Sequence, residues 1–136
     1  MTEFYQQYFC PSNEKFSVII EDDGKVAYAY LLSKKEIISD VWLYNQEKTP
    51  KSINWQNRNN MPFLNPQNYI LDKFIAPLND RTDVSLDWNY IHDLIEVKLY
   101  IRNEMIAILE PNAFPGWSVL AKIDGPLAKK INLNES

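Results

Sequence analysis

Residues 16–45, FSVIIEDDGKVAYAYLLSKKEIISDVWLYN, alternate two kinds of side chain over three successive segments. A period of two is typical of β-strands, because consecutive side chains of a strand point to opposite faces of its sheet. Asp23-Gly24 supplies the residues of a tight hairpin turn between the first two segments. The pattern predicts a three-stranded antiparallel meander. The small face made by Ala27 and Ala29 predicts that a second layer packs closely against it.

The C-terminal part of the sequence repeats this alternation. Four further strands are predicted, in TDVSLDWNY (82–90), in LIEVKLYIRNEMIAILE (94–110, two strands) and in WSVLAKI (117–123). The whole pattern predicts one domain over residues 1–136, of mainly β or α+β class. We expect an antiparallel sheet or sandwich of about seven strands with one or two short helices.

The predicted hairpin in residues 94–110 has a definite register. A turn at Asn103-Glu104 places Ile101 opposite Ile106 and Leu99 opposite Ile108, so that apolar residues face each other along both strands. The strands after residue 82 are therefore expected to share one core, made of Val84, Leu86, Trp88, Val97, Leu99, Ile101, Ile106 and Ile108.

Short helices are predicted outside the strands. Asn65 followed by Pro66 has the residues of a helix N-cap and a first helical position, with an edge strand over residues 68–75 as the alternative. The N-terminal TEFYQQYF (2–9) also fits a short helix. The C-terminal LAKKINLNES (127–136) fits a short helix or a tail.

The segment NAFPGWS (112–118) has the composition of a sharp corner between strands. Pro115 suits the first position of a turn, and Gly116 suits a position of positive φ. An aromatic residue before proline also favours a cis bond between Phe114 and Pro115. We interpret this segment as a structural corner and not as a site.

The composition limits the classes of function. The chain has 136 residues, 46% of them hydrophobic, and a net charge of −4. This net charge does not favour nucleic acid, whose phosphates require clustered Lys and Arg. No apolar run is long enough to span a membrane, and no signal peptide is visible at the N-terminus. The single cysteine, Cys10, cannot form an internal disulfide, and we therefore expect a cytoplasmic protein.

Residues suited to catalysis or to metal binding are few. His92 is the one histidine, which excludes sites built on two imidazoles, and the three glycines stand too far apart for a phosphate-binding loop. Cys10 and His92 could form a nucleophile–base dyad, with Asp93 or Asp87 orienting the ring. An inert thiol among aromatic residues is the alternative that we favour. The sequence therefore predicts no catalysis, no metal and no cofactor.

Asp83 and Asp87 fall on one face of the strand predicted over residues 82–90. Four residues along a strand separate two carboxylates by roughly 13 Å, which is too far for a glycosidase pair. We interpret these acids as a solvated face or as an acidic patch for a basic partner.

The connection over residues 46–65 has neither helical nor strand periodicity, and it contains KSINWQNRNNMPFL (51–64). Long connections in compact domains are either functional or disordered, and the apolar residues here favour an anchored loop. As a partner-binding loop it would use the residues Trp55, Arg58, Asn57 and Asn59. The alternatives are a packed cover over one end of the sheet, or a carbohydrate site in which the ring of Trp55 stacks on a sugar.

With no catalytic set in the sequence, binding to another protein is the leading predicted function. A concrete form is a small bacterial inhibitor of the immunity type, which neutralises a toxin by surface complementarity. Frequent Asn, Lys and Ile with scarce Arg agree with an AT-rich bacterial gene. The alternatives are a small-ligand or carbohydrate-binding domain, and a subunit of a homo-oligomer joined through an apolar edge around residues 94–110.

Overall fold

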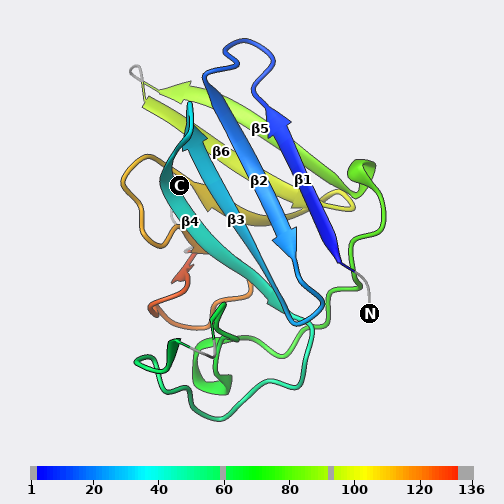
Figure 1. Ribbon diagram of the computed structural model, residues 1–136, viewed down its shortest axis with the longest axis vertical. Coiled ribbons are helices and arrows are strands. Elements are labelled where there is room, and N and C mark those ends of the chain that lie inside the picture. The colour runs from blue at the N-terminus through cyan, green and yellow to red at the C-terminus, as the bar shows by residue number, and fades with distance from the viewer. Residues whose placement is uncertain (1–2, 59–60, 92–93, 132–136) are drawn as a thin grey trace.

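The computed structural model describes residues 3–58, 61–91 and 94–131. These residues form two sheets, which we call the front sheet and the back sheet from their places in Figure 1. The front sheet has the order β1-β2-β3-β4, with β1 (Phe4–Phe9), β2 (Phe16–Asp22), β3 (Val26–Ser33) and β4 (Glu36–Asn45). The back sheet has the order β5-β6-β7-β8-β9, with β5 (Val84–Ile91), β6 (Leu94–Ile101), β7 (Glu104–Leu109), β8 (Trp117–Ser118) and β9 (Lys129–Lys130).

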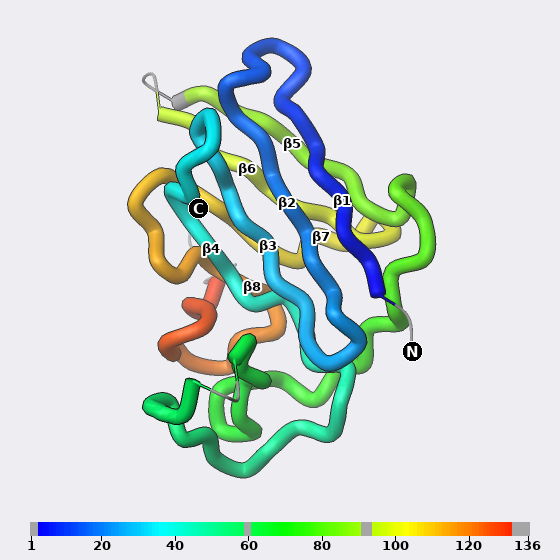
Figure 2. The backbone as a smooth tube through the Cα atoms, in the orientation of Figure 1, coloured from blue at the N-terminus to red at the C-terminus, as the bar shows by residue number. Residues whose placement is uncertain are grey.

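The two sheets lie face to face and enclose one core (Figures 1 and 2). Helix is almost absent from the described residues. The two helical segments named there are 3-10 helices of one turn each, η2 (Gln67–Tyr69) and η3 (Arg81–Asp83). The predicted mainly β class is confirmed. The described strands number nine instead of about seven, because residues 4–9 form an additional strand of the front sheet and residues 129–130 an additional strand of the back sheet.

The meander predicted over residues 16–45 is confirmed as β2, β3 and β4. The small face of β3 points into the core, where Ala27 and Ala29 are fully buried. Ala29 pairs with Ile20 on one side and with Val41 on the other, and both neighbours are also fully buried. Small side chains at the centre of this sheet leave room for the larger apolar side chains of the back sheet.

The predicted N-terminal helix is wrong, because residues 4–9 form β1. This strand pairs antiparallel with β2 along its whole length, from Phe4 opposite Asp22 to Phe9 opposite Ser17. Pairing with a neighbouring strand overrides the local preference, which is weak for so short a segment.

The predicted register of the β6–β7 hairpin is also wrong. Arg102 and Asn103 make the turn with φ values of 48° and 71°, so Ile101 pairs with Glu104. Two central residues of positive φ match the right-handed twist of a hairpin, and Asn tolerates this conformation. A register shift then leaves Ile106 as an extra residue on β7.

The bulge explains how the predicted core differs from the observed one. Ile106 and Ala107 are both buried, although they are consecutive. Ile108 falls on the outer face opposite Lys98 and is only partly buried. The other predicted members are either buried or packed against the core, namely Val84, Leu86, Trp88, Val97, Leu99 and Ile101.

The helix predicted after Asn65 shortens to the single 3-10 turn η2, with Pro66 as its N-cap and no side-chain capping bond. The alternative edge strand is reduced to one isolated bridge between Ile70 and Ala121. The backbone of Asn65 bonds to the side chain of Asn45 instead, with its N–H donating to Oδ1 and its carbonyl accepting from Nδ2, each at 2.9 Å.

The C-terminal segments also differ from their predictions. The strand expected over residues 117–123 is limited to β8, and Ile123 is exposed. Lys129 and Lys130 form β9 parallel to β8, which contradicts a helix there. Residues 132–136 of the predicted helix or tail lie outside the described residues.

The corner at residues 112–118 covers the edge of β4. Gly116 N–H donates to the carbonyl of Asp40 at 2.6 Å, and Asn112 N–H donates to that of Ile38 at 2.7 Å. The Phe114-Pro115 bond is cis as predicted, but the residue of positive φ is Asn112, at 70°, and not Gly116. Glycine is required at position 116 because a Cβ there would overlap the carbonyl oxygen of Ile108.

Candidate binding groove

The long connection between the sheets folds onto one end of the sandwich (Figure 1). We call residues 46–77 the loop platform. Its described residues contain neither an α-helix nor a strand, in agreement with the prediction for residues 46–65. The hydroxyl of Tyr28 donates to the carbonyl of Phe63 at 2.6 Å, and the side-chain amide of Gln46 donates to that of Ile75 at 3.1 Å. The first bond ties the loop platform to the front sheet, and the second joins the two ends of the loop platform.

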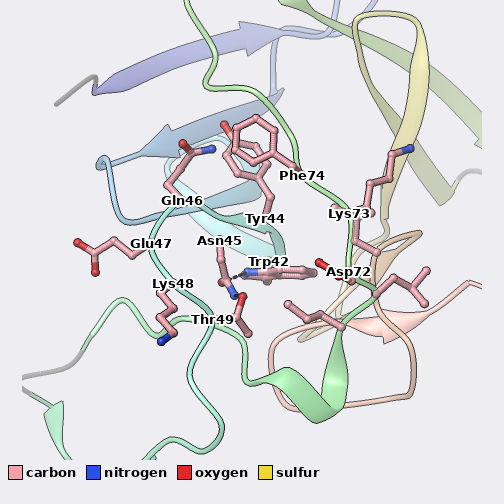
Figure 3. Close-up of a pocket in the computed structure, with 13 residues that line it drawn as sticks. Trp42, Tyr44, Asn45, Gln46, Glu47, Lys48, Thr49, Asp72, Lys73 and Phe74 are labelled. Atoms are coloured by element: carbon pink, nitrogen blue, oxygen red, sulfur yellow. Dashed lines mark hydrogen bonds between the residues drawn. The ribbon is translucent and has the colours of Figure 1, made fainter.

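A groove of about 290 Å³ lies between the chain that leaves β4 and residues 70–74 near the other end of the loop platform (Figure 3). Its lining comes from residues 42–49 on one side and from residues 70–74 and Leu120 on the other. A second cavity of about 610 Å³ shares Lys48, Thr49 and residues 70–72 with it, and continues toward Lys122. The two cavities are thus adjacent and share part of their walls.

Trp42 and Asn45 hold the base of the groove. Trp42 is 1% exposed, and its Nε1 donates to Oδ1 of Asn45 at 2.9 Å, as Figure 3 shows. The same oxygen accepts the backbone N–H of Asn65. Asn45, at the end of β4, therefore holds both the indole of Trp42 and the backbone of Asn65 in place.

The rim of the groove presents apolar side chains to solvent. Phe74 is 75% exposed and Leu71 is 45% exposed. In Figure 3 the ring of Phe74 lies over the same side of the groove as Tyr44 and Gln46. Exposed apolar groups beside a concave surface are typical of binding sites.

The charge around the groove is mixed. Residues 46–82 carry a net charge of +2, whereas the chain as a whole carries −4. The two cavities are lined by four lysines and two acids, namely Lys48, Lys51, Lys73, Lys122, Glu47 and Asp72. Lys73 donates to Glu104 at 2.8 Å, and this hydrogen bond lowers the pKa of the Glu104 carboxyl.

The loop residues predicted from the sequence lie in the loop platform. Trp55 is half-buried, with its ring edge-on to Phe63 at a centroid separation of 5.2 Å. Asn57 and Arg58 are exposed, and Asn59 lies outside the described residues. Trp55 thus has a packing role, while Arg58 is available to a partner.

The predicted acidic strand face is not formed as expected. Asp83 belongs to η3, where its carboxylate accepts the backbone N–H of Asn79 at 3.0 Å and lies 3.3 Å from Nη2 of Arg102. These contacts, the hydrogen bond from Asn79 first, lower the pKa of Asp83. Asp87 is exposed on β5, opposite Lys98 of β6. Asp83 therefore stabilises a turn, and Asp87 is paired across the strands with Lys98.

The alternative catalytic dyad has only one member in the described residues. Cys10 is fully buried, and its Sγ lies 3.5 Å from Oγ of Ser12. His92 and Asp93 lie outside the described residues. Within residues 3–58, 61–91 and 94–131, no three His, Cys, Asp or Glu side chains gather as a metal site would require.

The comparisons with known proteins give no relative. No protein-family model, no curated protein and no solved structure matches this chain. None of the helical segments in the described part of the chain has the length and apolar character needed to cross a membrane.

Proposed function

We propose that this protein is a non-catalytic module that binds another protein through its loop platform. The observation that carries the proposal is the exposed ring of Phe74 at the rim of a groove whose base is the buried ring of Trp42. Interface hot spots are enriched in aromatic residues and arginine, and they seat in pockets of this kind.

The anchoring of the loop platform supports this proposal. Hydrogen bonds from Tyr28, Asn45 and Gln46 restrict the loop before any partner arrives. A preordered surface loses less conformational entropy on binding than a mobile one. Arg58, an exposed residue of the same loop platform, would add a polar contact at the periphery of such an interface, where interfaces are typically polar.

The more specific form of the proposal is a cytoplasmic bacterial inhibitor of the immunity type. Inhibition by occlusion needs only a stable scaffold and a complementary surface, and loops on rigid scaffolds commonly supply such surfaces. The proposal needs no nucleic acid, membrane, metal or cofactor.

The test begins with the purified chain as bait in an extract of the cells that produce it. The retained protein is purified, and its affinity is measured by calorimetry against single variants. We expect Phe74→Ala and Arg58→Ala each to weaken binding by about 2 kcal/mol while leaving the melting temperature nearly unchanged. Trp55→Ala is expected to lower the melting temperature, because its ring packs on Phe63.

Leu94→Ala is the matched control, since Leu94 is 64% exposed and begins β6 at the end of the sandwich away from the loop platform (Figure 1). Its affinity should equal that of the wild type. If Phe74→Ala and Arg58→Ala also bind like the wild type, the loop platform is not the interface. If the partner binds but does not arrest growth when expressed alone, the inhibitor form fails and the binding module remains.

A further inference from the structure

The outer face of the front sheet has no covering layer away from the end at Tyr28, where the loop platform contacts it (Figure 1). Strand pairing places Gln7, Ile19, Tyr30 and Asp40 in one row across β1 to β4. None of these four residues is buried. On β1, the same alternation that turns Phe4 inward turns Tyr5 and Phe9 outward, where they are 60% and 52% exposed. This face therefore presents exposed aromatic and aliphatic side chains with polar ones between them.

Two carboxylates flank the centre of this face. Asp40 is directly opposite Tyr30, and Glu21 is opposite Tyr28 in the adjacent row. The rings of Tyr28 and Tyr30 are stacked, with centroids 6.3 Å apart. Among the described residues, neither carboxylate has an ion-pair partner. Burial, and then the charges of Glu21 and Asp40, raise the pKa of Tyr30 to about 12.

We propose that the outer face of the front sheet docks a basic, extended segment of a partner protein, with lysine or arginine side chains paired to Asp40 and Glu21. The stems of such side chains would lie on Tyr30 and Ile19 while their charged ends reach the carboxylates. A cation over a tyrosine ring gains further electrostatic attraction.

The charges select this occupant over the others. A second copy of the chain packed on this face would bring the same carboxylates together, and like charges in an interface are unfavourable. Acidic peptides and nucleic acid would be repelled for the same reason. The inference goes beyond the proposed function, because Ile19, Glu21, Tyr30 and Asp40 do not line the groove, although Tyr28 of this face is opposite Trp42 at the groove base.

The half-buried Asp40 carboxylate is expected to reduce stability at neutral pH, because burial raises its pKa above the usual 3.8. Tyr28 and Tyr30 are the titratable groups whose pKa values respond to Asp40, and neither supplies a positive charge. Asp40→Asn should therefore melt at a higher temperature than the wild type at neutral pH. A raised folded-state pKa means that this difference shrinks as the pH falls through that pKa, and disappears below the unfolded value. Thermal melts across this pH range measure it.

The binding test uses a synthetic peptide in which lysine alternates with phenylalanine, and a matched peptide with glutamate in place of lysine. Backbone amide NMR shifts should map the lysine peptide to Ile19, Tyr30 and their neighbours. The double variant Asp40→Asn, Glu21→Gln should bind it about tenfold or more weakly, and added salt should weaken wild-type binding.

Asp87→Asn is the matched control, because it removes one exposed carboxylate from the back sheet. It should leave the affinity within about twofold, as expected for a distant charge in physiological salt. The inference is overturned if Asp87→Asn weakens binding as much as the double variant, if the shifts map to the back sheet or the groove, or if the glutamate peptide binds equally. It is also overturned if the wild type dimerises through this face and the double variant strengthens the dimer. The variants of Phe74 and Arg58 test the groove separately.

Discussion

Replacing Trp42 by alanine is expected to lower the free energy of unfolding by about 3–5 kcal/mol. The indole is 1% exposed on β4 and forms the base of the groove, so its removal leaves a large cavity between the front sheet and the loop platform. Asn45 also loses the hydrogen bond from Nε1. Equilibrium unfolding in urea at neutral pH measures the change.

Trp42→Phe separates the two contributions. Phenylalanine keeps part of the buried area but lacks the indole N–H. Trp42→Phe should therefore lower the free energy of unfolding by clearly less than Trp42→Ala. A loss below about 1 kcal/mol for alanine would mean that Trp42 is not packed as described, since full burial of a large ring contributes more than this. The same two variants should weaken partner binding through the groove in the same order.

Replacing Leu99 by alanine is expected to cost about 2–5 kcal/mol in the same measurement. Leu99 is fully buried on β6, which pairs with β5 on one side and β7 on the other. Neither neighbour can close the resulting cavity without disturbing a strand pairing.

Leu94→Ala on the same strand is the control for Leu99, because Leu94 is 64% exposed. Its effect should stay within about 0.5 kcal/mol, as for most surface substitutions. Equal effects at the two positions would contradict the observed inward and outward alternation of β6.

The meander over residues 16–45 was predictable because its information is local. Alternation decides which face of each strand is buried, and Asp23-Gly24 decides where the chain turns. The N-terminal strand β1 was not predictable in this way. Its aromatic residues also suit one side of a short helix, and only the pairing with β2 decides between the two.

The groove depends on contacts between distant parts of the chain, which explains why the sequence did not reveal it. Trp42 and Phe74 lie on separate sides of a long connection, and nothing in their local pattern indicates that they line one depression. The exposed apolar pair Leu71 and Phe74 in a proline-bounded segment was the available signal. For the front face, the signal was the tyrosine alternation of β3 together with Asp40 on β4.

The position of the loop platform in the chain bears on how this protein can diverge. The segment leaves the last strand of the front sheet and enters the first strand of the back sheet, so it interrupts neither pairing order. Changes in its length or sequence leave the register of both sheets intact, provided that Asn45 and Tyr28 keep their bonds to it. Surface loops also tolerate insertions at low entropic cost. If the loop platform is the partner surface that we propose, replacement of this single continuous segment would change the partner and keep the sandwich.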